Sequence, residues 1–373
     1  MKKIRVTLRG KEAYIKDTKE AHKIHAKGYP GVPLPGGGLK LSLVETAYLL
    51  LKGSVEVYLK KEKRVLDMGE FLFYSSQAER KFGKSFAAYR EIRERGFFVK
   101  IEENYLNIFQ PDIKKLRKIP YAKLLVFEEN EEIDLVEVLK EARRFQRLGI
   151  LLFAGVVDAE GDVTYFRFSD FREEGSIQMK KLHLSFLQRL KELFSEDKDL
   201  TVRFSFYPEK GGCLLSSTHP EHKLEAILHH TLFFGKMVGD ALKLGFYEGR
   251  YLLEIFKKKL ALSSDQIVVA GEDEQEIGEL ERLYFQLRKK NFLPKTGFKY
   301  GSHFRVYKKL EEGHHAEYLV HLLEKKRLPL FTLEAMVRLA TSVNKEMVFA
   351  FSKDEEFSYL KVVRVVPAPG KVG

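Results

Sequence analysis

The alternation of apolar and polar residues predicts short helices and strands throughout the chain. Apolar residues recur at helical intervals over Leu41–Lys52, with Ser42 as the N-cap and Glu45 completing a capping box. A further helix is predicted over Gln77–Arg95. It should end there, because Gly96 is the residue type that commonly follows a helix end. The residues before the first of these helices instead alternate short strand-like runs with turns.

One order of elements is predicted twice in the chain. It consists of two strands, a helix and two further strands, which favours a compact mixed sheet packed on one main helix. The first copy runs through Tyr121–Phe127, the helix Asp134–Leu148 and the strands Ile150–Val157 and Val163–Phe168, and the second extends over Phe292–Val366 with its helix at Leu330–Asn344. Between the copies, the pattern predicts helices over Gln178–Ser195, Lys223–His230 and Gly249–Leu260, and strands over Leu200–Tyr207 and Cys213–Ser217.

Direct sequence matches between the two halves indicate a tandem duplication. Four pairs of segments match in the same order and at similar separations, which a duplication explains better than chance. We therefore predict a mixed α/β fold of the α+β kind, repeated in tandem. The matched pairs are Glu45–Leu50 with Glu248–Leu253, Tyr89–Lys100 with Tyr284–Lys295, Tyr121–Val126 with His315–Val320, and Leu152–Ala154 with Val348–Ala350.

The charge balance bears on the kind of partner. The chain has 373 residues, enough for several compact units, and 65 Lys and Arg against 53 Asp and Glu give a net charge of +12. This excess favours a polyanionic partner over an acidic protein or a simple metabolite. A merely solvated surface explains the charge about equally well when it is taken alone.

The cysteine count and the apolar runs bear on the compartment. Cys213 is the only cysteine, so the chain can form neither an intrachain disulfide nor a cysteine-rich zinc site, as is typical of a reducing interior. The N-terminus lacks the apolar core of a signal peptide. The longest apolar run, Ile150–Val157, is too short to span a bilayer. We therefore expect a cytoplasmic protein without a membrane partner.

Three residues near the C-terminus suit acid–base chemistry on a phosphodiester. Tyr307 ends the predicted strand Phe304–Tyr307, His315 precedes another strand, and Lys345 closes the next helix. Taken singly, the tyrosine fits an amphipathic strand edge and the lysine fits a helix C-terminus. Together they bring a phenol, an imidazole and an ammonium towards the end of one small unit, a set that can cleave a phosphodiester without a metal.

The histidines around this site offer an alternative, because His303, His314, His315 and His321 lie close together in the sequence. Such a group could suggest a metal site. Adjacent residues on a strand point to opposite faces, however, so His314 and His315 cannot easily serve as ligands together. His315 is the preferred imidazole, with His314 as the fallback.

The stretch Lys295–Val366 closely resembles the catalytic domain of the archaeal tRNA-splicing endonucleases, of the homodimeric two-repeat type. The signature of that family runs through Phe304–Tyr307, His315–Val320 and the lysine after the next helix. The resemblance implies that Tyr307 is the general base on a ribose 2′-hydroxyl, His315 the general acid on the departing 5′-oxygen, and Lys345 the cation opposite the phosphoryl oxygens. It also implies 2′,3′-cyclic phosphate and 5′-hydroxyl products, with no metal or cofactor.

The same resemblance divides the chain into four parts. It implies an N-terminal subdomain of a silent repeat at 1–75, a pseudo-catalytic domain at 76–170, an N-terminal subdomain of the second repeat at 171–270, and a catalytic endonuclease domain at 271–373. Residues 173–199 have no counterpart in the family pattern and are predicted to be an insertion. The first repeat is silent because Phe109, Tyr121 and Gly149 fall opposite or near the positions of the tyrosine, the histidine and the lysine.

Further residues are assigned by the resemblance alone. Arg338 and Arg364 match two arginines that clamp a bulged base, with Lys361 as the alternative to Arg364. The acidic turn Asp158, Glu160 and Asp162 matches a loop that docks into a basic cleft of the other subunit. These assignments imply a homodimer that acts on the bulge–helix–bulge of precursor tRNA.

Two other functions are left open by the sequence. One is a non-catalytic RNA-binding or structural subunit of a splicing endonuclease assembly, which the three catalytic candidates in the second repeat disfavour. The other is a metal-dependent DNA nuclease, which is less favoured because no cluster of carboxylates with a lysine partner is evident.

Overall fold

The computed structural model describes residues 3–111, 119–177, 179–207, 209, 211–260, 262–271, 278–309, 315–353 and 356–370. Contacts divide the chain into two compact units. Unit 1 consists of Met1–Asp170, Lys325–Thr341 and Leu360–Gly373, and unit 2 of Phe171–Glu324 and Ser342–Tyr359. Each unit therefore combines segments that are distant in the sequence.

Unit 1 begins with a small sheet and three helices. The sheet has the strand order β3-β4-β2-β1-β5-β6, in which the neighbours β1 and β5 are parallel. The elements are β1 (Ile4–Arg9), β2 (Glu12–Ile15), α1 (Thr18–His25), β3 (Val32–Pro33), β4 (Leu39–Ser42), α2 (Leu43–Leu51), β5 (Val55–Leu59), β6 (Arg64–Leu66) and α3 (Met68–Ala78).

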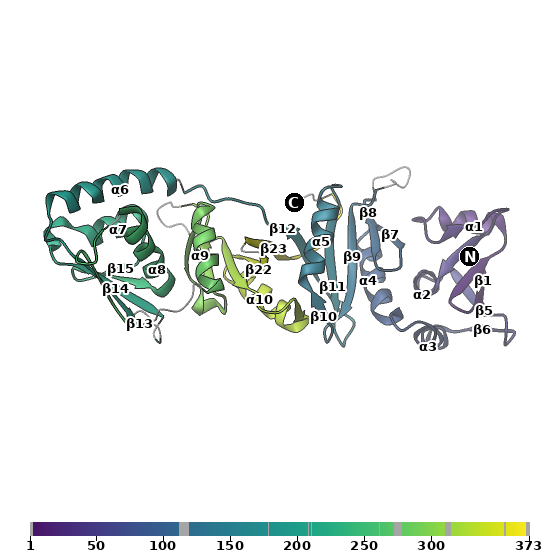
Figure 1. Ribbon diagram of the computed structural model, residues 1–373. Helices are drawn as coiled ribbons and strands as arrows, with labels where there is room; N and C mark the ends of the chain where they lie inside the picture. The colour runs from purple at the N-terminus through teal and green to yellow at the C-terminus, as the bar shows by residue number, and fades with distance from the viewer. Residues whose placement is uncertain are drawn as a thin grey trace. The chain divides into compact units, whose positions relative to one another are not determined.

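The rest of unit 1 is a second sheet with its helices. The strand order is β23-β12-β11-β9-β8-β7, of which β23 contributes the residues from Leu360 onward, and α5 lies along β11 and β12 (Figure 1). The elements are α4 (Phe82–Glu94), β7 (Phe98–Ile101), β8 (Leu106–Phe109), β9 (Ala122–Glu128), β10 (Glu132–Asp134), α5 (Leu135–Gln146), β11 (Leu151–Val157), β12 (Val163–Asp170), β21 (Arg327–Pro329), α10 (Leu330–Ser342) and β23 (Glu356–Val365).

Unit 2 contains a five-stranded sheet with the order β15-β16-β14-β13-β17. It also contains the strands β18-β19-β20-β22, which pair in that order, and α6 packs against α7 (Figure 1). The elements are α6 (Met179–Glu196), β13 (Val202–Tyr207), β14 (Gly212–Ser217), η2 (Pro220–His222), α7 (Leu224–Leu232), β15 (Lys236–Val238), β16 (Ala241–Gly245), α8 (Phe246–Ile255), η3 (Phe256–Leu260), β17 (Ile267–Ala270), α9 (Glu279–Lys289), β18 (Leu293–Thr296), η4 (Phe298–Tyr300), β19 (Phe304–Tyr307), β20 (Tyr318–Leu322) and β22 (Glu346–Lys353).

The predicted mixed α/β fold in tandem copies is confirmed. The two copies also share individual hydrogen bonds. The carboxylate of Glu45, at the third position of α2, accepts the N–H groups of Ser42 at 3.0 Å and of Gly31 at 2.6 Å. In the second copy Glu248, at the third position of α8, accepts from Gly245 at 3.0 Å and from Gly235 at 3.4 Å. The matched segments thus bury the same glutamate in the same way.

The two glycines explain part of this pattern. Gly31 and Gly235 both have a positive φ, 72° and 53°, and a Cβ on either would lie 2.4 Å from a carbonyl oxygen of the neighbouring strand. Only glycine therefore lets the backbone approach closely enough for its N–H to reach the glutamate.

The helix predictions were wrong at two places in unit 1. The polar segment Thr18–His25 forms α1, which buries only Ala21 and Ile24 and so carries a weak apolar pattern. The single helix predicted over Gln77–Arg95 is the end of α3 followed by α4. Glu79 is extended, with φ −140° and ψ 110°, and interrupts the helix.

In unit 2 the helix predicted over Gly249–Leu260 begins earlier, at Phe246, and continues into the π-helical turn η3. The helix predicted over Gln178–Ser195 is α6, described as Met179–Glu196, and Gln178 itself lies outside the described residues.

Candidate active site

Three adjacent strands of unit 2 bring the predicted catalytic residues to one end of a sheet. Strand β19 runs antiparallel to β20 with Val306 opposite Tyr318, and β20 runs parallel to β22 with Tyr318 opposite Glu346. Tyr307 is the last residue of β19, and Lys345 immediately precedes β22. Both are one residue beyond this paired row, so strand alternation places them on the same face of the sheet.

His315 lies at the same end of the sheet, in the segment that leads into β20. It is exposed to solvent, whereas the next residue, Ala316, is buried. Glu317 then joins the sheet, because its N–H donates to the oxygen of Val306 at 3.2 Å. The fallback residue His314 lies outside the described residues.

Lys345 is half-buried and held by two contacts. Its Nζ donates to the carbonyl oxygen of Val343 at 3.2 Å and lies 5.6 Å from the centre of the Tyr300 ring. Asn344, between helix α10 and strand β22, has a positive φ of 55°, which turns the chain sharply at this point. The turn and the ring thus fix the position of the ammonium group.

Tyr307 is half-buried with a cation on one side and apolar groups on another. The guanidinium carbon of Arg305, two residues earlier on the same face, lies 5.9 Å from the centre of the Tyr307 ring. The ring also packs against Ile177 and Leu293. The phenol is therefore held between a positive charge and an apolar cluster.

The segment that joins the two repeats, residues 171–177, supports this tyrosine. Glu173 Oε2 accepts from Lys308 Nζ at 2.6 Å and from the Tyr318 hydroxyl at 2.7 Å. Burial and the carboxylate of Glu173 raise the pKa of Tyr318, so its hydroxyl is the donor. The N–H of Ser176 donates to the carbonyl oxygen of Lys308 at 2.7 Å. These contacts and the packing of Ile177 therefore hold the joining segment against Tyr307 and Lys308, at the end of β19.

Sequence reasoning missed this support. It assigned 173–199 to an insertion, whereas the described part of that segment up to Ile177 contacts the candidate catalytic tyrosine. Glu173 is 135 residues from Lys308 in the sequence. No local pattern signals a contact over such a distance.

A pocket of about 690 Å³ lies beside the turn between β18 and β19. Its walls include Lys299, Tyr300 and Arg305. Tyr300 contacts the ammonium of Lys345, and Arg305 lies over the ring of Tyr307. The pocket is large enough for a nucleotide and has two cationic side chains in its wall.

The other histidines of the group have a structural role. The rings of His303 and His321 are stacked with their centres 4.3 Å apart, and His303 Nδ1 accepts the N–H of Leu322 at 3.0 Å. Burial lowers the pKa of His303, and burial and the neighbouring His303 lower the pKa of His321 to about 4. Both rings are therefore neutral near pH 7.

The corresponding positions of the first repeat have no such set of groups. Phe109 is buried at the end of β8, Tyr121 packs against the rings of Phe97 and Phe153, and Gly149 is a left-handed turn residue with φ 69°. Burial raises the pKa of Tyr121. This copy therefore presents no imidazole or ammonium at these positions.

The remaining predicted residues belong to unit 1. Arg338 on α10 and Arg364 on β23 are exposed, and Lys361 is half-buried. Asp158, Glu160 and Asp162 are exposed on the turn between β11 and β12. Asp158 also builds that turn, because its Oδ1 accepts the N–H groups of Glu160 and Asp162, both at 2.9 Å.

The fold is that of a two-repeat α/β protein whose second repeat holds the candidate tyrosine, histidine and lysine at one end of a sheet. None of the helices in the described residues is long and apolar enough to cross a membrane. Two family descriptions match the chain. "tRNA intron endonuclease, N-terminal domain" matches residues 4–72, and "tRNA intron endonuclease, catalytic C-terminal domain" matches residues 279–359, which include Tyr307, His315 and Lys345.

Curated proteins called tRNA-splicing endonuclease are similar to the chain over most of its length. The one from Methanococcoides burtonii is 28% identical over 382 residues, covering 95% of this chain and 98% of that protein. The one from Haloarcula marismortui is 29% identical, with coverages of 92% and 93%. The one from Methanothermobacter thermautotrophicus is 34% identical over 136 residues, which cover 35% of this chain and 80% of that protein. The chain belongs to the tRNA intron endonuclease family.

Proposed function

We propose that the chain is a tRNA-splicing endonuclease that cleaves precursor tRNA at bulge–helix–bulge sites by metal-independent transesterification. The observation that carries this proposal is the position of Tyr307, His315 and Lys345 at one end of the strands β19, β20 and β22. Family membership and the names of the relatives support the substrate. The net charge of +12 suits an RNA ligand.

The reaction needs one base, one acid and one cation. Tyr307 takes the proton of the ribose 2′-hydroxyl, and the 2′-oxygen attacks the adjacent phosphorus. The bond from phosphorus to the 5′-oxygen breaks as His315 donates a proton to that oxygen. Lys345 stabilises the charge that develops on the non-bridging oxygens. The products are a 2′,3′-cyclic phosphate and a 5′-hydroxyl.

The surroundings of the three residues fit these roles. The guanidinium carbon of Arg305 lies 5.9 Å from the centre of the Tyr307 ring, so a cation adjoins the proposed base. His315 is exposed and accessible to a large RNA. Lys345 is held by Val343 and Tyr300 and needs little reorganisation to meet a phosphate.

The substrate-recognition residues are part of the same proposal. Arg338 and Arg364 are exposed, as side chains that clamp a bulged base must be. A guanidinium is planar, so it can stack on a base and bind a phosphate at the same time. Lys361 is the alternative to Arg364.

The reaction class can be tested with a bulge–helix–bulge RNA in the presence of a strong chelator. We expect cleavage at both bulges, because the nucleophile belongs to the substrate and every other group belongs to the protein. The cut ends should be 2′,3′-cyclic phosphates and 5′-hydroxyls. Activity that returns only with added divalent metal, or ends that are 3′-hydroxyl and 5′-phosphate, would exclude the mechanism.

The joining segment offers a test of how Tyr307 is positioned. Glu173→Gln removes the charge that holds Lys308 while keeping the size of the side chain. We expect kcat to fall about 10-fold with little change in KM, because small displacements of a reacting group are costly. Glu174→Gln is the matched control, since Glu174 is exposed. An unchanged kcat, or a change confined to KM, would show that the segment does not act through Tyr307.

We further propose that the enzyme is a cytoplasmic homodimer in which the acidic turn of each chain docks on a basic surface of its partner. Asp158 accepts two backbone N–H groups, so Glu160 and Asp162 are the side chains available for docking. This arrangement gives the silent repeat a role. It holds two active units at one spacing, matched to two cleavage sites.

Reversing Glu160 and Asp162 to lysine should therefore convert the dimer to a monomer, because like charges across an interface cost several kcal/mol. The turn should survive, since Asp158 is retained. Light scattering measures the mass, and cleavage of a two-bulge RNA should be lost along with the dimer. The control Glu103→Lys/Asp265→Lys changes the charge equally at other exposed positions. A variant that stays dimeric and cuts normally would show that the acidic residues form only a turn.

A further inference from the structure

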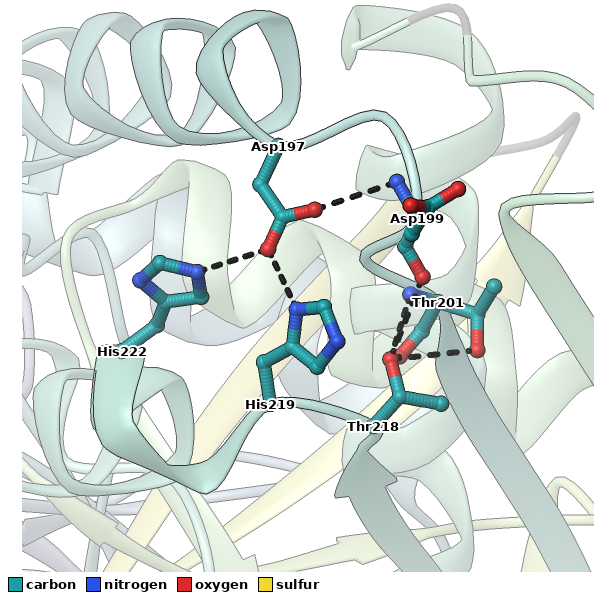
Figure 2. A network of polar contacts seen from close by, with 6 residues as sticks. All are labelled: Asp197, Asp199, Thr201, Thr218, His219 and His222. Atoms are coloured by element: carbon teal, nitrogen blue, oxygen red, sulfur yellow. Dashed lines mark hydrogen bonds and ion pairs between the residues drawn. The ribbon is translucent and has the colours of Figure 1, made fainter.

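A cluster of two histidines and an aspartate lies in unit 2, just after the end of strand β14 (Figure 2). Asp197 directly follows α6, and His219 and His222 lie at the turn η2. His222 Nε2 is 2.8 Å from Asp197 Oδ2, and His219 Nδ1 contacts the same oxygen. One ligand atom from each of the three residues lies within 4.8 Å of the other two. Within the described residues, this is the group that has the spacing of a metal site.

The backbone holds the two histidines on one side of a short turn. They are three residues apart, with His219 just before η2 and His222 at its end, and the centres of their rings lie 5.8 Å apart. Pro220 is the first residue of η2, and Lys223 ends the turn in a left-handed conformation with φ 52°. Proline fixes its own φ, which restricts one backbone angle of the turn.

The aspartate and the base of the turn are held by separate hydrogen bonds. Asp197 Oδ1 accepts the N–H of Asp199 at 3.1 Å, which leaves Oδ2 towards the two imidazoles (Figure 2). Thr218, next to His219, accepts the N–H of Thr201 at 2.9 Å. Asp197 and the residue next to His219 are therefore each held by a contact outside the cluster.

The three side chains are ligands that suit a divalent ion of intermediate softness. Imidazole nitrogens and a carboxylate oxygen are typical zinc ligands, and two histidines with one carboxylate is a recurring zinc set. The side chains are 32%, 28% and 21% exposed for His219, His222 and Asp197. An ion could thus enter from solvent and complete its coordination with water.

We propose that Asp197, His219 and His222 form a binding site for a zinc ion. Zinc takes nitrogen and oxygen ligands at about 2.0–2.2 Å, so small side-chain rotations would replace the direct contacts by bonds to the ion. The ion would join the end of α6 to the connection between β14 and α7. It would stabilise the N-terminal part of the second repeat, whose helix α6 packs on α7. The cleavage residues do not belong to this cluster, so the proposal does not depend on the proposed function.

Zinc titration of the chelator-treated full chain, followed by calorimetry near neutral pH, tests the site. We expect one strong site per chain, weakened at least about 10-fold in Asp197→Asn and in His222→Gln, because each removes a ligand. The control is His230→Gln, an exposed histidine on α7 that should leave the strong site unchanged. Absence of a strong site, or equal binding by all of these variants, would overturn the proposal in favour of an ion pair between Asp197 and the imidazoles.

Thermal unfolding gives a second readout that does not require activity. Zinc should raise the Tm of the wild type and of His230→Gln, because an ion that binds only the folded state stabilises it. It should leave the Tm of His222→Gln unchanged. Circular dichroism establishes that this variant is folded, and His219→Gln replaces it if it is not. An equal rise of Tm in the wild type and the ligand variant would contradict the assignment.

Discussion

Replacing His315 with alanine is expected to lower cleavage by about 10²–10⁴-fold while RNA affinity changes little. The imidazole donates its proton to a leaving oxygen that carries little charge in the bound substrate. Its contribution therefore arises mainly in the transition state, and its loss reduces kcat rather than binding. Tyr307→Phe and Lys345→Met should have effects in the same range, because they remove the base and the charge-stabilising cation. Single-turnover cleavage and filter binding of the same RNA separate the two quantities.

Combining these changes should cost little more than the most damaging single change. Residues that act as a unit are strongly non-additive, since the first substitution already disables the step to which the others contribute. Tyr121→Phe, in the first repeat opposite His315, is the matched control and should cleave normally. If His314→Ala proves damaging while His315→Ala is harmless, the assignment of the acid is displaced by one residue. If the losses multiply, the three groups do not share one reaction step.

The parts of the structure that could be predicted depend on residues close together in the sequence. The capping box of Ser42 and Glu45 starts α2, and Gly96 follows α4 with a positive φ of 97°. The order of the catalytic candidates along the chain was enough to expect them at one sheet end. Each of them adjoins a strand with a clear apolar pattern, and short parallel and antiparallel pairings then bring the strand ends together.

The missed features depend on contacts between distant residues. Glu173 and Ile177 belong to a joining segment without apolar periodicity, and their importance follows only from their contacts with Lys308, Tyr318 and Tyr307. The cluster of Asp197 with His219 and His222 is similar, because the aspartate is separated from the histidines by two strands. Two histidines three residues apart can be recognised in the sequence as a possible metal-binding pair. Nothing in the sequence indicates that Asp197 lies beside them.

Unit 1 also includes a segment from late in the sequence, Lys325–Thr341. Helix α10 follows β21, which pairs with β10 in unit 1, although both elements lie in the sequence between β20 and β22 of unit 2. Sequence order alone assigns a helix to the strands that flank it. The hydrogen bond beside the β10–β21 pair, from Leu135 N–H to the oxygen of Lys326, joins residues that are distant in the sequence and leaves no local signal.

A single 2′-deoxy nucleotide on the 5′ side of one scissile phosphate should abolish cleavage at that site, because it removes the nucleophile itself. No side chain can compensate, since the proposed reaction has no water in its first step and Tyr307 acts only on a proton. Binding should be nearly unchanged, because one hydroxyl is a small part of a large and mostly electrostatic RNA contact.

The second bulge of the same RNA retains its 2′-hydroxyl and should still be cut, which provides an internal control for folding and binding. Mapping both sites on one labelled RNA therefore separates loss of the nucleophile from loss of the complex. Cleavage at the deoxy position at the normal rate would mean that water attacks the phosphorus, and the roles given to Tyr307 and His315 would then have to be abandoned.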